Sequence, residues 1–155
     1  MKKPLLEKFV RDAIINYLSR IKWGRNLRVR GIDEHGVDIS VWHNRYQRRW
    51  LIEAKGDSKA KIKAPRSRQE VNFNIVLGQI LTRMKVEKGK KYYKYTRKYG
   101  IGFPGSYYEI VIRRLPWAVC DVLNLFVFFV DAGGKVNCLD WKDLKKIQTK
   151  KSKNN

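Results

Sequence analysis

The sequence predicts an α/β fold, a sheet with helices packed against it. Two observations support this prediction: apolar side chains recur at helical spacing in two long segments, and several shorter segments are rich in β-branched and aromatic residues. At 155 residues, of which 43% are hydrophobic, the chain is long enough to bury one core. We therefore expect one domain, residues 1–144, followed by a basic and disordered tail, residues 145–155.

Apolar stripes predict the helices. Residues 4–19 and 71–84 each carry apolar side chains on one side at helical spacing. Residues 107–114 form a third helical stretch, and Pro116 begins a fourth helix, because proline suits the first helical turn. From about Lys142 onward lysine dominates, which predicts a frayed helix that gives way to disorder.

The expected strands lie between these helices, at residues 27–30, 37–43, 49–55, 99–104, 125–130 and 135–139. The second and third of them flank the polar turn Asn-Arg-Tyr-Gln, which predicts a hairpin. Residues 125–130 are apolar throughout, as in a strand buried on both faces.

Charge narrows the choice of partner. The chain has 35 Lys and Arg but only 14 Asp and Glu, so its formal net charge is +21. A field of that size favours a polyanion, with nucleic acid as the first candidate and an anionic membrane surface as the second. No apolar run reaches the roughly 18–20 residues of a membrane span, so we expect no membrane-embedded segment. The only two cysteines have apolar neighbours, which predicts reduced thiols in a cytoplasmic protein.

Two of the scarce carboxylates fall in segments predicted as sheet core. Asp38 lies in the stretch GVDI and Glu53 in LIEAKG, with Lys55 two residues further on and on the same strand face. A buried carboxylate is costly unless it has a partner. The partner can be a cationic side chain: Lys55 for Glu53, or an arginine for Asp38. It can equally be Mg²⁺ or Mn²⁺, because hard oxygen ligands on adjacent strands suit these ions.

The arrangement of Asp38, Glu53 and Lys55 resembles the PD-(D/E)XK nuclease superfamily, whose fold is called restriction-endonuclease-like. Val37 stands where the name of the superfamily puts proline. The resemblance in the order of elements extends from Glu7 to about residue 139. It implies a mixed central β-sheet flanked by helices, metal-dependent cleavage of DNA, and frequent homodimers.

The resemblance also implies roles for single residues. The two acids, with the peptide carbonyl of Ala54, would hold Mg²⁺ or Mn²⁺, and Lys55 would assist the attacking water. Glu7 matches a glutamate found in the first helix of many members. On its own it would be an ordinary acid at a helix N-terminus, stabilised by the helix dipole.

Gln79 lies in GQILTR, which looks like the glutamine-bearing helix that follows the lysine strand in several branches of the superfamily. Arg83 lies four residues later on the same border of the apolar stripe. Two interpretations remain open for these residues. They either cap or solvate the edge of the stripe, or they hold the scissile phosphate or orient Lys55.

A basic region surrounds the predicted metal strand in the sequence. Residues 59–99 contain 13 Lys and Arg against two Glu, with four tyrosines interleaved. Lysine and arginine neutralise phosphates, and tyrosine can stack on bases or donate to phosphate. The expected nucleic-acid-binding residues are Lys59, Lys61, Lys63, Arg66, Arg68, Arg83, Lys90, Lys91, Tyr93, Lys94 and Arg97.

Together these features predict a Mg²⁺-dependent endodeoxyribonuclease that acts on duplex or branched DNA as a homodimer. Two alternatives remain open. The first is a nucleic-acid-binding module that has the same fold and no catalysis. The second is a membrane-surface protein that uses the lysine-rich tail, although the tail lacks a strongly amphipathic basic helix. The sequence does not firmly distinguish DNA from RNA.

Overall fold

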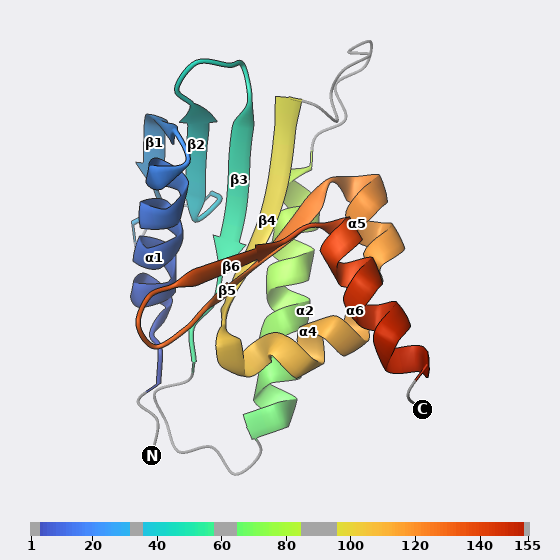
Figure 1. Ribbon diagram of the computed structural model, residues 1–155. Coiled ribbons are helices and arrows are strands. Elements are labelled where there is room, and N and C mark those ends of the chain that lie inside the picture. Colours follow the sequence, from blue (N-terminus) through green and yellow to red (C-terminus); the bar gives the residue numbers. More distant parts are fainter. Residues whose placement is uncertain (1–3, 32–35, 58–64, 85–95, 154–155) are drawn as a thin grey trace.

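The computed structural model describes residues 4–31, 36–57, 65–84 and 96–153, in which a six-stranded sheet lies between helices on both faces (Figure 1). The strands are β1 (Trp23–Val29), β2 (Ile39–His43), β3 (Arg49–Ala54), β4 (Arg97–Pro104), β5 (Leu125–Val130) and β6 (Val136–Leu139). The helices are α1 (Glu7–Arg20), α2 (Pro65–Arg83), α4 (Tyr108–Arg114), α5 (Trp117–Leu123) and α6 (Trp141–Lys153), with a 3-10 turn η1 (Gly105–Tyr107) before α4. The predicted α/β fold is confirmed. None of the described helices is both long and apolar enough to cross a bilayer.

The strands follow one another across the sheet in chain order. The pairs β1/β2, β2/β3 and β5/β6 are antiparallel, whereas β3/β4 and β4/β5 are parallel, so the sheet is mixed. Each parallel step needs a crossover, and right-handed crossovers that advance in one direction leave their helices on the same face. Accordingly α2, α4 and α5 share one face with α6, and α1 covers the other.

Each face of the sheet has its own apolar core. Phe73 of α2 belongs to the core on the α2 face, whereas Ile14 of α1 belongs to the opposite one. Alternate residues of β5 serve the two cores: Val127 points to the α2 face and Phe128 to the α1 face. A strand covered on both sides has no solvent-facing position, which explains why residues 125–130 are apolar throughout.

Both cysteines are free, as expected. Burial raises the pKa of Cys120 and that of Cys138 to about 12. Both thiols therefore stay protonated and weakly nucleophilic near neutral pH.

Two elements are longer than the sequence predicted. The helix expected over 71–84 begins at Pro65, which suits a first helical turn, and its early residues are exposed, so no apolar stripe marks them. The strand expected at 27–30 begins at Trp23. It is an edge strand whose side chains after Trp23 are mostly exposed, and a strand of that kind needs no apolar alternation.

The predicted disordered tail at 145–155 is wrong for its described part, because α6 continues to Lys153. Leu144 is buried in the α2-face core and Ile147 packs against that core, so one side of this lysine-rich helix is anchored. Gln148 adds polar contacts: its side-chain amide donates to the carbonyls of Ile112 and Leu115, each at 2.8 Å, and accepts from the N–H of Trp117 at 3.1 Å. Because lysine dominates this segment, the sequence pattern did not reveal its three inward-facing residues, Leu144, Ile147 and Gln148.

Gly56 fixes the start of α1 against the end of β3. A side chain at this position would collide with the backbone of Leu6 and Glu7. The backbone after Gly56 is hydrogen-bonded to the segment before α1, since the N–H of Asp57 donates to the carbonyl of Leu5 at 2.7 Å. The close approach brings Glu7 beside the residue that precedes Gly56, Lys55.

We expect Gln148→Ala to lower the free energy of unfolding by about 1–3 kcal/mol, because it leaves polar backbone groups at the α4–α5 junction without a partner. Chemical denaturation measures this change. Thr149→Ala is the matched control, since the Thr149 hydroxyl bonds carbonyls of its own helix, those of Lys145 and Lys146. Equal stability losses in the two variants would show that Gln148 does not anchor α6.

Candidate active site

Asp38 and Glu53 lie side by side on the α2 face of the sheet. Asp38 directly precedes β2 and Glu53 lies in β3, and the pairing of Ile39 with Ile52 brings them onto neighbouring strands. Their side chains are only 3% and 1% exposed. One oxygen of Asp38, Oδ2, accepts a hydrogen bond from the N–H of Ala54 at 2.8 Å, which holds this carboxyl group against the end of β3.

Two arginines approach the pair from different elements. An amino group of Arg30, which follows β1, lies 3.1 Å from Asp38 Oδ1. The Nε of Arg83, at the end of α2, lies 3.5 Å from Glu53 Oε1. Each guanidinium also donates to the carbonyl of Gly36 at 3.2 Å. The two acids and the two arginines therefore form one connected network.

The arginines do not fully compensate the carboxylates. Burial is the main cause that raises the pKa of Glu53 to about 7, and the adjacent Asp38 raises it further, while Arg83 and Arg30 act in the opposite direction. Glu53 Oε2 is buried and accepts no hydrogen bond from the described part of the chain, and Asp38 Oδ1 has only its ion pair with Arg30. The site therefore favours an additional proton or cation between the two acids.

A divalent cation fits this site by its chemistry. Both side chains offer hard oxygen atoms, and Mg²⁺ is commonly bound by one or two carboxylates together with water and substrate phosphates. In residues 4–31, 36–57, 65–84 and 96–153, no group of three or more His, Cys, Asp and Glu side chains could hold a metal. An ion here would therefore have Asp38 and Glu53 as its carboxylate ligands, without Glu7.

Lys55 and Glu7, both predicted as catalytic residues, form an ion pair with each other. Lys55 Nζ lies 3.0 Å from Glu7 Oε2, and each side chain is about one-third exposed. Lys55 follows β3 directly, and its N–H donates to the carbonyl of Gly102 in β4 at 2.9 Å. Strand alternation predicted that Lys55 lies on the same strand face as Glu53. In the fold, the close approach of α1 at Gly56 brings Glu7 to Lys55, and these two side chains pair.

The other predicted residues fall into three groups. Gln79 is half-buried on α2, one turn before Arg83, and its side chain makes no hydrogen bond to another described residue. Arg66 and Arg68 are exposed near the start of α2, and Arg97 begins β4. The remaining predicted nucleic-acid contacts lie outside the described residues: Lys59, Lys61, Lys63, Lys90, Lys91, Tyr93 and Lys94.

Arg30 was not predicted as a site residue. Its sequence neighbourhood contains several arginines, and nothing in the sequence distinguishes it from them. Its position depends on strand pairing, because the N–H of Arg30 donates to the carbonyl of Asp38 at 3.0 Å and so places both side chains at the same register.

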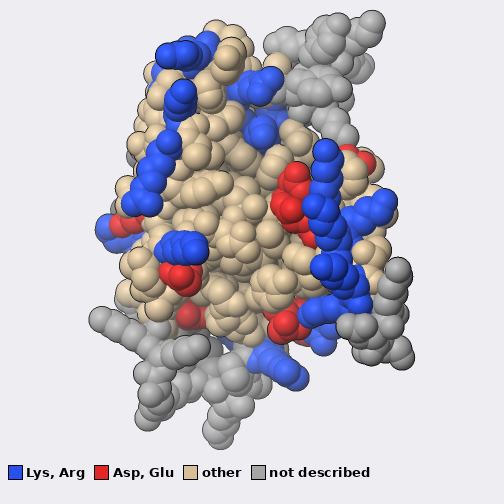
Figure 2. All heavy atoms as spheres, viewed as in Figure 1, with Lys and Arg blue, Asp and Glu red and all other residues tan. Residues whose placement is uncertain are grey.

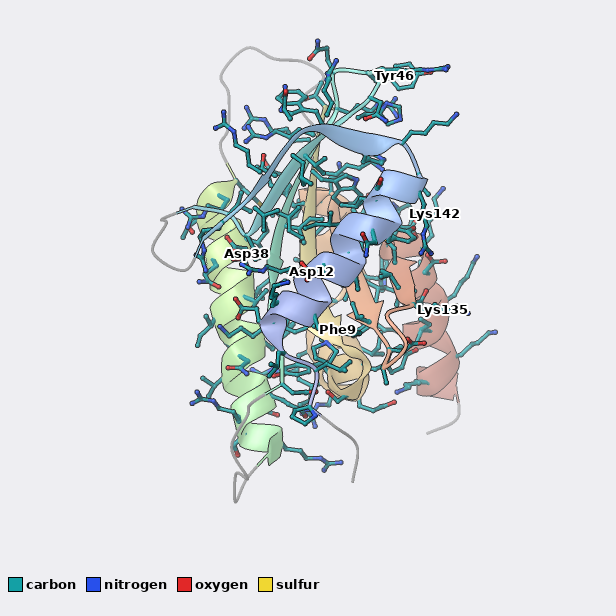
Figure 3. The ribbon with its side chains drawn as sticks, turned by 90° about the vertical axis from the view of Figure 1, so that its left-hand side faces the viewer. Phe9, Asp12, Asp38, Tyr46, Lys135 and Lys142 are labelled. Atoms are coloured by element: carbon teal, nitrogen blue, oxygen red, sulfur yellow. The ribbon has the colours of Figure 1, made fainter. Side chains whose placement is uncertain are left out.

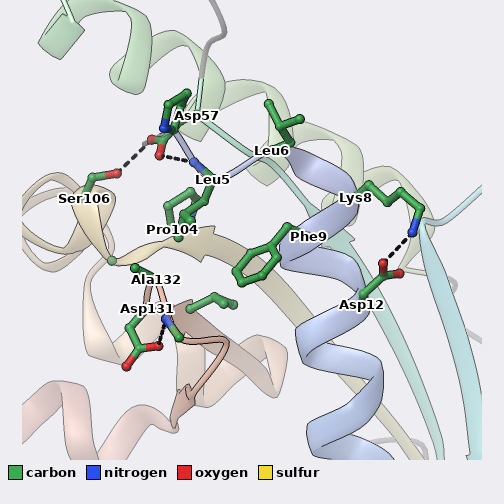
Figure 4. A pocket seen from close by; sticks show the side chains of 14 residues that line it. Leu5, Leu6, Lys8, Phe9, Asp12, Asp57, Pro104, Ser106, Asp131 and Ala132 are labelled. Carbon is green, nitrogen blue, oxygen red and sulfur yellow. Dashed lines mark hydrogen bonds and ion pairs between the residues drawn. The ribbon is translucent and has the colours of Figure 1, made fainter. Parts of the chain in front are cut away.

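A separate cavity of about 1330 Å³ lies between the start of α1 and the loops after β4 and β5 (Figure 4). Its polar lining is mainly acidic: Asp12, Asp57 and Asp131 line it, with Lys8 paired to Asp12. Neither Asp38 nor Glu53 lines it. Acids at its rim repel phosphate, so we do not assign this cavity to a nucleic-acid site.

We expect Glu53 to make stability fall with rising pH. Between pH 4.5, its ordinary pKa, and about 7, its pKa in the fold, only the unfolded chain loses this proton. Ionisation therefore favours unfolding in that window, by about 3 kcal/mol in total, because one pKa unit corresponds to about 1.36 kcal/mol. Glu53→Gln should lack this loss when denaturation curves are measured from pH 4 to 8. Asp12→Asn, at an exposed ion pair, is the control; parallel profiles for wild type and Glu53→Gln would contradict the assignment.

Comparison with protein-family models, with curated proteins and with solved structures found no significant match for this chain. Its function must therefore be inferred from the chemistry of its own residues.

Proposed function

We propose that this chain is a metal-dependent deoxyribonuclease of the restriction-endonuclease-like fold. The observation that carries the proposal is the buried pair of Asp38 and Glu53, in which Glu53 Oε2 accepts no hydrogen bond from a described residue and the pKa of Glu53 is raised to about 7. Structural acids in a protein of net charge +21 have many cations available, yet this pair remains incompletely compensated. The resemblance to the PD-(D/E)XK superfamily gives the pair its proposed role, and it also motivates the expected homodimer.

Each residue of the site has a chemical task in this proposal. Asp38 and Glu53 hold a Mg²⁺ or Mn²⁺ ion, with Asp38 oriented by the N–H of Ala54. When bound, such an ion polarises a phosphodiester and makes water more acidic. Lys55 supplies a partly exposed ammonium group that neutralises charge developing on the phosphate. Glu7 positions that ammonium group through their ion pair.

The surface charge supports a nucleic-acid substrate. Lys and Arg gather at the upper end of the molecule and along α6, while much of the face between them is uncharged (Figure 2). Such separated basic regions attract a phosphate backbone and raise the rate of encounter. The exposed Arg66 and Arg68 at the start of α2 add to this charge.

One observation favours the alternative of a nucleic-acid-binding module without catalysis. Arg30 and Arg83 contact the two acids and share the carbonyl of Gly36, as in an ion-pair network with a purely structural role. The two functions differ in what a metal ion does. It is required for cleavage in the first and has no specific place in the second.

We expect Asp38→Asn, Glu53→Gln and Lys55→Ala each to lose Mg²⁺-dependent cleavage. The first two keep the shape of the side chain and remove the metal-binding charge; the third removes the ammonium group, at a cost of about 10²–10⁴-fold in rate. The assay is a panel of linear, supercoiled, branched and single-stranded DNA with Mg²⁺ or EDTA. Lys135→Ala, at an exposed lysine, is the control. A wild type that cuts no substrate would support the binding module, and three variants that cut normally would refute the site.

We expect Mn²⁺ or Mg²⁺ to raise the melting temperature of the wild type, because an ion that binds only the folded state stabilises it. The effect should be larger at pH 8 than at pH 6, since the ion competes with the proton on Glu53. Asp38→Asn and Glu53→Gln should show no shift. Glu7→Gln should shift like the wild type, because Glu7 is paired with Lys55; a lost shift in this variant would make Glu7 a ligand.

A further inference from the structure

A basic surface surrounds the hairpin end of β1–β3, at the upper end of the molecule in Figure 2, and extends along the edge strand β1 to Arg28, which pairs with Ser40. In Figure 3, Tyr46 marks this end and Asp38 lies well below it. The hairpin surface, as we call it, is formed by Lys22, Arg25, Arg28, Arg45, Tyr46, Arg48 and Arg49. No cation of this surface forms an ion pair with an acid of the described chain. The sequence analysis did not select any of these residues as a nucleic-acid contact.

The cations of the hairpin surface lie close enough to repel one another. Besides burial, Arg48, Lys22, Arg25 and Arg45 all lower the pKa of His43. Burial lowers the pKa of Arg49 too, and the nearby Arg97 and Arg28 lower it further. No carboxylate contributes in either case. Crowded like charges destabilise a fold, and a bound polyanion would relieve the repulsion.

The turn between β2 and β3 holds its shape without help from a partner. His43 Nδ1 accepts hydrogen bonds from the N–H groups of Arg45 and Tyr46 at 3.1 and 3.3 Å. A hydrogen bond from the N–H of His43 to the carbonyl of Arg48, at 2.8 Å, joins the end of β2 to the residue before β3. Because Nδ1 accepts these bonds, the imidazole is neutral and the turn is pre-ordered.

This turn presents an aromatic ring to solvent. Tyr46 is 58% exposed, its ring centre lies 4.8 Å from that of His43, and the guanidinium of Arg48 lies 5.6 Å from it. An exposed aromatic ring among phosphate-binding cations is the arrangement on which single-stranded nucleic acids stack their bases. A paired base within a duplex has both faces covered by its neighbours, so only an unpaired base can accept this contact.

The strands themselves set the distance between the two sites. Arg49 and Glu53 lie on the same face of β3, four residues apart, which is about 13 Å at about 3.3 Å per residue. The residues of β3 between them are buried, so a nucleic-acid strand bound at the hairpin would reach the two acids only over the surface of the molecule.

We propose that the hairpin surface binds an unpaired stretch of nucleic acid, with Tyr46 stacked on a base and the surrounding arginines on phosphates. The substrate class is then single-stranded or branched nucleic acid rather than uniform duplex. This binding does not rest on the proposed nuclease activity.

Binding of fluorescent oligonucleotides in EDTA tests the aromatic contact without cleavage. Tyr46→Ala should weaken binding of a single strand about 5- to 150-fold, the equivalent of about 1–3 kcal/mol for one stacked base. Its binding to a blunt duplex should change much less. Tyr46→Phe, which keeps the ring, should bind like the wild type. Melting temperatures should stay unchanged, since the side chain is exposed at a turn. Single-strand affinity that survives Tyr46→Ala would overturn the stacking contact.

A second comparison tests the arginines with matched charge. The hairpin variant carries Arg28→Gln, Arg45→Gln and Arg48→Gln. The control variant carries Lys8→Gln, Arg113→Gln and Lys151→Gln, whose cations are already paired with acids. Each lost phosphate contact should reduce the slope of log K against log salt by about 0.7 on a single strand. Only the hairpin variant should show this loss, and equal slopes in the two variants would contradict the proposal.

The two proposals can fail separately. If Asp38→Asn cuts like the wild type while Tyr46→Ala loses single-strand binding, the nuclease site is wrong and the hairpin surface stands. If Asp38→Asn stops cleavage while the hairpin variants bind normally, the nuclease site stands and the hairpin surface is wrong.

Discussion

The burial of Asp38 and Glu53 against each other is the constraint on which the candidate site depends. Two adjacent carboxylates at 3% and 1% exposure would be prohibitive without compensation, and the fold provides it from three directions. Arg30 arrives after β1, Arg83 arrives at the end of α2, and the N–H of Ala54 comes from the neighbouring residue of β3. These elements must dock together before the two acids can share one site. The local structure of β1–β3 and α2 is thus tied to a single pair of side chains.

The architecture separates two kinds of charge interaction. On the α2 face, the acids are held in a dry network in which electrostatic effects are strong. At the end of β3, the pair of Lys55 and Glu7 is one-third exposed and therefore weaker and more easily rearranged. Gly56 lets α1 begin against the end of β3, because a side chain at this position would collide with the backbone of Leu6 and Glu7.

Local sequence pattern predicted some features of this site, whereas the features that depend on contacts between distant residues were missed. The predicted hairpin correctly brought Asp38 and Glu53 onto neighbouring strands, because the two strand segments and the polar turn between them can be recognised from local sequence. The partner of Lys55 could not be predicted, since it depends on a contact between α1 and Gly56 across some 50 positions of chain. Arg30 was missed for the same reason. The error in α6 has a different cause: its anchoring residues, Leu144, Ile147 and Gln148, are outnumbered by lysines that merely coat the outer side.

The irregular pairing of β1 has a consequence for how copies of the protein can meet. β1 forms one edge of the sheet, and its register against β2 shifts twice, between Trp23 and Arg25 and between Arg25 and Arg28. A bulged edge with projecting arginines is a poor template for another strand, because the backbone groups are out of step and the second copy brings the same charge. Sheet-to-sheet aggregation through this edge is therefore disfavoured. A symmetric pair of these molecules that forms through another surface leaves the edge of β1 unpaired in both copies.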